Sequence, residues 1–234
     1  MIAVKFEEKE KIGLQYALET LHGCSPFGQE KIRRLRFYTP EERAELETEL
    51  YNVERAAAAA EELKDQYTKL MTGLCQMKDI RTSLRRCAAG ETPDHVELFE
   101  IKGYLQRLDG MRPVFEQINA VTHFKGMTFH EVKDALAVLD PDGTGSRGFY
   151  IPDSATAKLK EIRSAKKEVE ERLFHAQTDA EKDDLRLKRT RLCGEEDAEE
   201  MHVRKAMGAA LAPMVDDLLS DAETAGRLDF IIQK

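Results

Sequence analysis

The sequence has no tryptophan, only four cysteines and no long uninterrupted run of apolar residues. A membrane-spanning helix needs about 20 consecutive apolar residues, and the start of the chain lacks the apolar core of a signal peptide. We therefore expect a cytoplasmic protein with no membrane partner. Cys24, Cys75, Cys87 and Cys193 form no C-x-x-C pair and lack the spacing of a zinc site, so free thiols are expected.

Motifs for catalysis and nucleotide binding are also missing. The chain contains no G-x-x-x-x-G-K-[ST] phosphate loop, no G-x-S-x-G elbow and no H-E-x-x-H pair. Its carboxylates alternate with bases along helical patterns, where solvation and i,i+4 pairing explain them. The histidines are scattered: His22 lies near Cys24 without further ligands, and the others considered are His123, His130, His175 and His202. We expect no catalytic residue, no bound cofactor and no metal ligand in this chain.

One stretch imitates a calcium loop. Asp140, Asp142 and Thr144 occupy the first ligand positions of an EF-hand pattern, but the twelfth position is Ile151 where a bidentate glutamate is required. The glycines around them and the apolar residues that follow indicate a tight structural loop, with at most one small β-hairpin.

The net charge is unfavourable for nucleic acid. A formal charge of −8 and a pI of about 5.4 mean that the surface as a whole repels phosphate. One local basic group is the candidate for phosphate contact: Arg186, Lys188, Arg189 and Arg191. The alternative is that these bases complement the dipole of a helix C-terminus, since acids follow at residue 195.

Helical periodicity dominates the first 139 residues. Thr39 with Glu42, and Thr128 with Glu131, have the spacing of capping boxes. The pattern places Leu35 inward, and it also places the set Val96, Leu98, Ile101 and Leu105 on a buried face. The expected helices cover residues 7–22, 29–37, 39–73, 74–87, 92–108, 114–122 and 132–139.

Two long, charge-rich helices follow, and Asp153 or Ser154 is expected to cap the first. Each has only a narrow apolar stripe, typical of a rod that is mostly exposed. The stripes are Leu159, Ile162, Val169 and Leu173 in the first run, and Met201, Met207, Leu211 and Leu218 in the second, over 195–219. Their succession predicts an arm that leaves a helical body and returns.

The turn of the arm has two candidate positions. Thr178 and Glu181 have the spacing of a third capping box, which favours a turn at residues 177–178. Acids then precede bases up to Gly194, which favours a helix end and a turn at 193–194. We favour a short separate helix between these points, at the tip.

Four stretches, in this order, resemble a known family. They are 18–35 (LETLHGCSPFGQEKIRRL), 79–90 (DIRTSLRRCAAG) with 97–101 (ELFEI), 139–143 (LDPDG) with 153–163 (DSATAKLKEIR), and 228–230 (LDF). Their order and spacing resemble the core and lever region of the MutS family of DNA mismatch-repair and recombination-related ATPases. The likeness extends over nearly the whole chain, although each stretch is short.

The resemblance implies a fold and a function. The fold would be all-α, a MutS core-domain-like helical bundle with two long protruding lever helices. The core would occupy 1–152, the levers 153–219 with a clamp that is absent or reduced near 177–194, and the return to the core 220–234. An ATPase domain would follow beyond the chain and would bring ATP and Mg²⁺, mismatched or branched DNA, and a homodimer partner.

Two departures from the family pattern qualify this expectation. We expect no mismatch-reading domain, because core-like sequence begins close to Met1, and we interpret the bare Phe-x-Glu match of Phe6-Glu7-Glu8 as chance because no Gly-Asp precedes it. The expected layout is closer to paralogues without that domain. The clamp that holds DNA in the family has almost no room here. The expected function is to couple an ATPase mechanically to a nucleic acid. The alternative is a helical protein-interaction scaffold without DNA or nucleotide binding.

Overall fold

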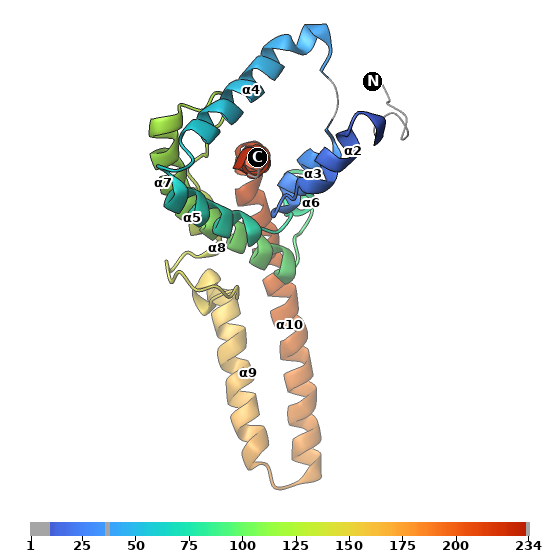
Figure 1. Ribbon diagram of the computed structural model, residues 1–234. Helices are drawn as coiled ribbons and strands as arrows, with labels where there is room; N and C mark the ends of the chain where they lie inside the picture. The colour runs from blue at the N-terminus through green and yellow to red at the C-terminus, as the bar shows by residue number, and fades with distance from the viewer. Residues whose placement is uncertain (1–9, 36–37, 233–234) are drawn as a thin grey trace.

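The computed structural model describes residues 10–35 and 38–232, and the regular structure in these two ranges is entirely helical (Figure 1). The all-α prediction is confirmed, and the described residues contain no β-hairpin. In chain order the elements are α2 (Leu14–Thr20), α3 (Pro26–Arg33), η1 (Pro40–Glu42), α4 (Arg43–Ala58), α5 (Lys64–Cys75), α6 (Arg81–Ala88), α7 (His95–Thr122), α8 (Lys133–Leu139), η2 (Asp153–Ala155), α9 (Ala157–His175), α10 (Asp179–Leu211), η3 (Ala212–Met214) and α11 (Val215–Ile232).

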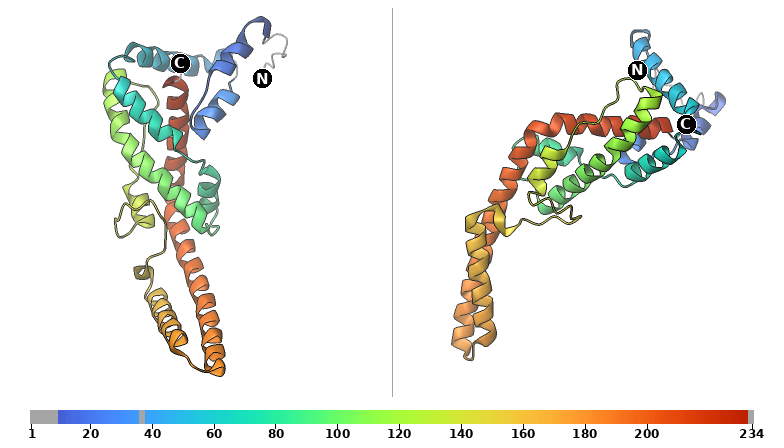
Figure 2. Two further views of the ribbon diagram at one scale, coloured as in Figure 1. Left: turned by 60° about the horizontal axis from the view of Figure 1, so that its bottom comes forward. Right: turned by 90° about the vertical axis from the view of Figure 1, so that its left-hand side faces the viewer.

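The helices form a body and an arm. Figure 1 shows α9 and α10 side by side below the other helices, and the right-hand view of Figure 2 shows a corner between α10 and α11. The corner falls at η3, which contains Pro213. Proline has no backbone N–H and crowds the preceding turn, so it bends a helical path without ending it. The body and the arm are thus joined by one bent helical path.

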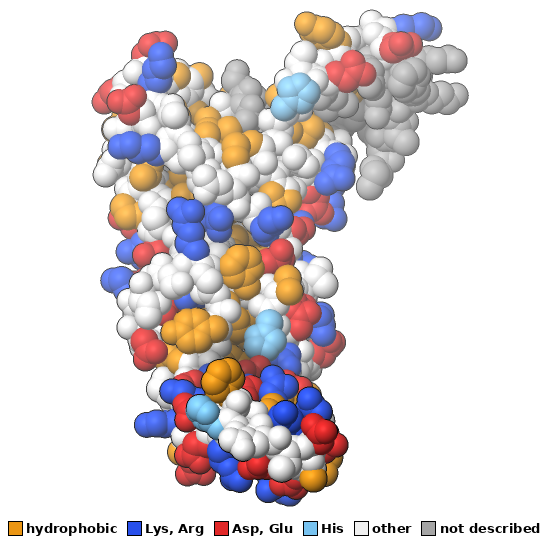
Figure 3. All heavy atoms as spheres, turned by 90° about the horizontal axis from the view of Figure 1, so that it is seen from below, with side chains coloured by type: hydrophobic (Ala, Val, Ile, Leu, Met, Phe, Trp, Pro, Cys, Tyr) orange, Lys and Arg blue, Asp and Glu red, His pale blue; other side chains and the backbone are white. Residues whose placement is uncertain are grey.

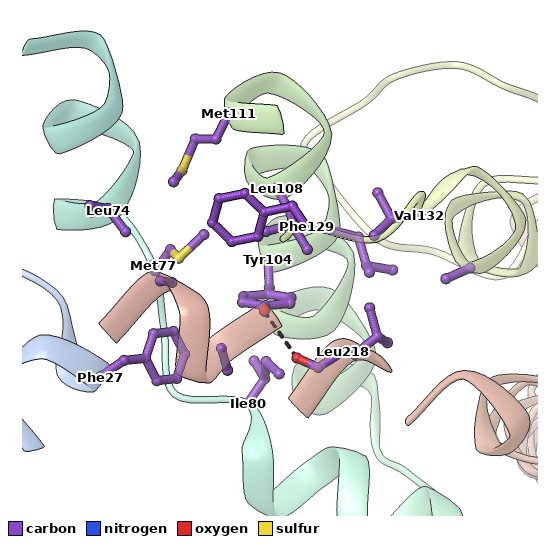
Figure 4. Close-up of a cluster of buried hydrophobic side chains, with 14 of the residues drawn as sticks. Phe27, Leu74, Met77, Ile80, Tyr104, Leu108, Met111, Phe129, Val132 and Leu218 are labelled. Atoms are coloured by element: carbon purple, nitrogen blue, oxygen red, sulfur yellow. Dashed lines mark hydrogen bonds between the residues drawn. The ribbon is translucent and has the colours of Figure 1, made fainter. Parts of the chain in front are cut away.

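The core of the body surrounds α7 and α11. Tyr104 is almost fully buried, and its hydroxyl donates a hydrogen bond to the Leu218 carbonyl at 3.2 Å. Figure 4 shows Leu74 of α5, Met111 of α7 and Phe129 of the segment before α8 around the same region. Because the hydroxyl has a partner, the ring contributes its apolar surface without leaving a buried polar group unpaired.

Helix α3 lies against the end of α11 through small residues. A Cβ atom on Gly226 would lie 3.0 Å from the Phe27 carbonyl oxygen, and one on Gly28 would overlap the Asp229 carboxylate. Asp229 is fully buried and accepts hydrogen bonds from the Cys24 N–H at 3.2 Å and from the Ser25 N–H at 2.7 Å. Glycine therefore permits a close approach that brings a buried carboxylate to the start of α3.

Helix α4 is held to the body mainly by polar contacts. The Asn52 side chain is fully buried and exchanges two hydrogen bonds with the backbone of Lys125, at 3.0 and 2.8 Å. Glu49 pairs with Arg227 of α11 at 3.0 Å and with Lys31 of α3 at 3.4 Å. These bonds fix the position of a helix that contributes little apolar surface to the core.

The predicted helix over 39–73 is wrong in its middle. Its start is confirmed, since Thr39 and Glu42 form both bonds of a capping box. Helix α4 ends at Ala58, however, and the chain turns before α5 begins at Lys64. Ala59 and Leu63 are buried in this turn. Packing of this corner overrides the high helix propensity of the alanine run.

The next boundaries shift for a related reason. Gly73 does not end a helix but lies inside α5, where it leaves room for the Met111 side chain of α7. The predicted helix over 74–87 is interrupted between Cys75 and Arg81. Conversely, the helices expected over 92–108 and 114–122 are one helix, α7, which contains Pro113. Glycine and proline are therefore poor markers of helix ends in this body.

Some predicted faces and terminal boundaries are also wrong. Leu98, Ile101 and Leu105 are buried as expected, but Val96, Leu35 and Met201 are exposed. The expected helix over 29–37 begins earlier, at Pro26, and ends at Arg33. Residues 7–9 of the helix expected over 7–22 lie outside the described part of the chain, and so does the Phe-x-Glu pattern at residues 6–8. In the described part, α2 covers Leu14–Thr20.

Two predicted caps are wrong: α8 has no side-chain cap, and α9 is capped by another residue. Thr128 does not cap α8, because the N–H of His130 donates to the buried Asp221 of α11 at 3.0 Å. Helix α9 is capped by Thr156, whose hydroxyl accepts from the Leu159 N–H at 3.0 Å, because residues 153–155 form η2. A tertiary contact holds the residues before α8, whereas the start of α9 is set locally by η2 and the Thr156 cap.

Candidate functional site: the arm and its root

The arm is a pair of antiparallel helices of unequal length. Helix α10 has 33 residues and runs unbroken through Gly194, so the separate tip helix that we favoured is wrong. The turn is at residues 176–178, where the Thr178 hydroxyl accepts from the Glu181 N–H at 3.3 Å. At a rise of 1.5 Å per residue, α10 is about 50 Å long. It spans the arm and reaches the body.

The predicted apolar stripe of the arm is narrow. On α9 only Leu159 and Ile162 are buried, and Val169 and Leu173 are half-buried. Near the tip, Leu185 of α10 is fully buried. A stripe this narrow seals the contact between two helices but cannot form a cavity for a ligand.

Arg163 lies at the centre of the arm's root. Its guanidinium donates to Glu196 at 2.9 Å and to Glu200 at 2.7 Å, both on α10. It also donates to Asp153 at 2.5 Å and to the Ile151 carbonyl at 2.8 Å, both in the segment that leads into α9. Burial disfavours the cation, but these hydrogen bonds raise the pKa of Arg163 above its ordinary value. One side chain thus joins both arm helices to the entry segment.

Further ion pairs extend this cluster. Lys166 pairs with Glu196, and burial of Glu196 is outweighed by its bonds to Lys166 and Arg163, which hold its pKa below the ordinary range. Glu199 accepts from Lys158 and from the Thr156 hydroxyl, each at 2.9 Å, and these bonds lower its pKa as well. The carboxylates are therefore ionised partners at neutral pH.

The root also contacts the body. Arg204 of α10 donates to the Pro93 carbonyl at 2.9 Å, and His95 at the start of α7 lies 3.2 Å from Glu200. A Cβ atom on Gly208 would lie 2.9 Å from Cδ of Pro93. Helix α10 therefore rests directly on the segment before α7, and the arm cannot tilt without disturbing that contact.

The predicted basic group lies toward the tip, and every one of its cations has an acidic partner. Arg186 pairs with Asp183 at 3.0 Å, Lys188 with Asp184 at 2.7 Å, Arg191 with Glu195 at 2.9 Å, and Arg189 with Glu170 of α9 at 2.8 Å. A phosphate would have to compete with these carboxylates. The expected helix C-terminus is wrong as well, because α10 continues to Leu211, so these bases pair with carboxylates of the arm instead of complementing a helix dipole.

The calcium-like loop is a structural turn. Asp140 accepts from the Thr144 N–H, the Thr144 hydroxyl and the Gly145 N–H at 2.8 to 3.2 Å, so its own loop occupies its oxygens. The buried Lys102 of α7 donates to the Gly148 carbonyl at 3.2 Å and fixes the loop to the body. In the described part of the chain, no three side chains of His, Cys, Asp or Glu gather as a metal site requires.

The histidines do not form a site together. His130 is the most constrained, because its Nδ1 lies 2.7 Å from Asp221. His123 ends α7 in a left-handed conformation, and His175 contacts the exposed Phe174. His22 and Cys24 are not joined, since the Cys24 thiol hydrogen-bonds the Met71 carbonyl at 3.8 Å.

Sequence reasoning missed the buried carboxylates of α11. Burial raises the pKa of Asp221 despite its bonds to His130. Together with Asp229, it lies in a helix whose other buried residues are mostly apolar or small. In the sequence, an isolated acid within a mostly apolar helical pattern was the only sign of these buried carboxylates. The groups that bond to them, just before α3 and just before α8, are far away in sequence.

No described helix is long and apolar enough to cross a membrane. The chain matches no protein-family model and no curated protein. Its function therefore has to be inferred from the arm, its root and the body.

Proposed function

We propose that this chain is the core and lever module of a MutS-like DNA-repair protein, and that it transmits movement mechanically between its body and the tip of its arm. The observation that carries the proposal is the unbroken path of α10, which continues through η3 into α11. A displacement at either end of a stiff helical path must move the other end, which is the physical requirement for such coupling.

The root supports this role. The bonds of Arg163 to Glu196, Glu200 and Asp153 keep α9 beside α10, so the arm would move as one body. Around α11 the buried Asp229 and Tyr104 tie the other end of the path to α3 and α7.

In this proposal the chemistry belongs to a neighbouring ATPase domain, which would bind ATP and Mg²⁺ and form the dimer. DNA, mismatched or branched, would be held mainly by other parts of the protein, because the arm offers no unpaired group of bases among Arg186, Lys188, Arg189 and Arg191.

Titration with DNA tests the contribution of the tip. Duplex and branched DNA are titrated into the protein over a salt series, beside a variant in which Arg186, Lys188, Arg189 and Arg191 are changed to Glu. We expect the affinity of the two proteins to be the same. A loss of tenfold or more in the variant, with a shallower salt dependence, would show that the tip grips phosphate.

Spin labels test the mechanical part. Spin labels are attached at Gln177 of the tip and at the exposed Lys78 of the body, and pulsed electron paramagnetic resonance measures the distance between them. We expect one narrow distance distribution, which broadens when Arg163 is changed to Gln. A broad distribution in the unaltered protein would contradict a stiff arm.

The reading frame after Lys234 tests the family resemblance. A predicted strand followed by a phosphate loop would support it, and an immediate stop codon would contradict the proposal of an ATPase subunit.

A helical scaffold for protein partners is the second candidate. It is favoured by Phe174 and Leu187, which are 85% and 71% exposed on the arm. Figure 3, which looks at the tip end-on, shows apolar side chains among its charges. A photo-crosslinking residue in place of Phe174 distinguishes the candidates, because a scaffold would crosslink to a partner protein whether or not nucleotide and DNA are present.

A further inference from the structure

Two cysteines that are 51 positions apart in the sequence meet in the body. The Cys24 thiol donates to the Met71 carbonyl at 3.8 Å. In a helix that carbonyl accepts the N–H of the residue four positions later, which is Cys75, the last residue of α5. A helical side chain leans back over the turn before its own Cα, so the Cys75 side chain lies over the turn that the Cys24 thiol contacts. The two sulfur atoms are therefore neighbours, although both cysteines are free.

The two thiols differ in their access to solvent. Cys75 is exposed and lines an open hollow of about 600 Å³ between α5 and the end of α11, whereas Cys24 is half-buried. Burial, the neighbouring Cys75 thiol and the charge of Asp229 together raise the pKa of Cys24 far above its ordinary value. Cys24 is therefore rarely deprotonated, and an oxidant in solution reaches the exposed Cys75 first.

We propose that Cys24 and Cys75 form a reversible intramolecular disulfide when the protein meets a hydroperoxide. The Cys75 thiolate attacks the peroxide oxygen, the O–O bond breaks, and Cys75 becomes a sulfenic acid while the peroxide leaves as an alkoxide or hydroxide. Cys24 then loses its proton as it attacks the Cys75 sulfur, the S–O bond breaks, and the leaving hydroxide takes up that proton as water. The sulfur atoms are oxidised by two electrons in total and the peroxide is reduced by two.

The disulfide would join three parts of the body. The Cys24 N–H already donates to Asp229 of α11, so a bond to Cys75 connects the start of α3, the end of α5 and the end of α11. A covalent link across this distance in sequence restricts the unfolded chain and raises the midpoint of thermal unfolding. Reduction by a dithiol restores the two free thiols.

The test treats the full chain with increasing hydrogen peroxide, followed by quenching, digestion and mass spectrometry without reduction. We expect one new crosslinked pair of peptides containing Cys24 and Cys75, loss of two titratable thiols per chain, and full recovery with dithiothreitol. Oxidation of Cys75 to sulfinic acid while Cys24 remains free would overturn the proposal, and so would a disulfide between two chains.

Three variants sharpen the test. Cys24→Ser should abolish the crosslink and let the sulfenic acid accumulate at Cys75, where dimedone traps it. Cys75→Ser should abolish both the crosslink and the dimedone adduct at this site. Cys193→Ser, which changes a half-buried thiol of the arm, should leave the crosslink unaltered. A crosslink that disappears in Cys193→Ser, or dimedone labelling at Cys24 instead of Cys75, would contradict the proposal. Circular dichroism establishes that each variant is folded.

Discussion

The body and the arm are both helical, but different forces hold them together. Helix α7 buries residues along its whole length, from Leu98 to Thr122, whereas α9 buries only Leu159 and Ile162. The arm compensates with ion pairs at its root, centred on Arg163. Apolar burial does not depend on pH and is not screened by salt, while ion pairs depend on pH and are weakened by salt. We therefore expect the body to supply most of the folding stability, and the stability of the arm to depend more strongly on salt and pH.

The largest difference should appear in leucine substitutions. Leu108 is fully buried in α7, so Leu108→Ala should lower the free energy of unfolding by about 2–5 kcal/mol, through lost burial and a residual cavity. Leu173 is half-buried in the arm, and Leu173→Ala should lower it by about 1 kcal/mol or less. Urea denaturation followed by circular dichroism measures both changes. Equal losses would mean that the arm is packed as tightly as the body.

Carboxylates provide the second contrast. Asp229→Asn should destabilise the protein by about 2–3 kcal/mol, because the amide nitrogen would face the N–H of either Cys24 or Ser25 and leave that buried donor unpaired. Asp197→Asn changes an exposed residue of α10 and should alter stability by about 0.5 kcal/mol or less. The same urea titration compares them, and a small effect of Asp229→Asn would show that its bonds are replaceable.

Two glycines of α10 should respond with opposite signs. Gly208→Ala places a methyl group 2.9 Å from Cδ of Pro93, so we expect a net loss of about 1 kcal/mol, with the strain partly offset by better helix propensity. Gly194 has open space around it, and Gly194→Ala should stabilise the protein by about 0.5–1 kcal/mol. Thermal unfolding of both variants checks the signs. A gain for Gly208→Ala would mean that the root can relax away from the body.

The sequence predicts local features of both regions well. The capping box of Thr39 and Glu42 and the burial of Leu98 and Ile101 depend on neighbours three or four residues away, so the pattern is sufficient. The narrow stripe of the arm is predicted for the same reason. The all-α class follows from the repetition of such local signals.

Features that depend on distant contacts are not predictable in this way. Gly73 is read as a helix end, but its role is to leave room for Met111, and Gly194 is read as a turn although nothing surrounds it. Arg163 was noted only as part of a motif, because its partners come from residues 151 to 200. The ion pair of Arg189 with Glu170 can be predicted only when the position of the arm's turn is known. Each of these needs the position of another element.

The smallest and most local effect should come from pH at the arm's root. The pKa of Glu196 and that of Glu199 are lowered in the folded protein, so these groups bind protons less readily than in the unfolded chain. Their stabilisation is complete above the ordinary glutamate pKa of about 4.3 and is lost as pH falls through their lower folded values. The raised pKa of Asp221 has the opposite sign, so its contribution to body stability decreases as pH rises through the acidic range.

Hydrogen exchange read by mass spectrometry separates the two regions across this pH range, after correction for the intrinsic pH dependence of exchange. Protection of peptides that contain the root residues 156–166 and 196–200 should fall before that of α7 as pH is lowered. Adding 1 M salt should produce a weaker change in the same direction. Arg163→Gln should remove most of this dependence, whereas Arg189→Gln, which breaks a more exposed pair near the tip, should leave it in place. Simultaneous loss of protection in both regions would show that the arm and the body unfold as one unit, and the ion pairs would then add to a single cooperative structure instead of adjusting a separate one.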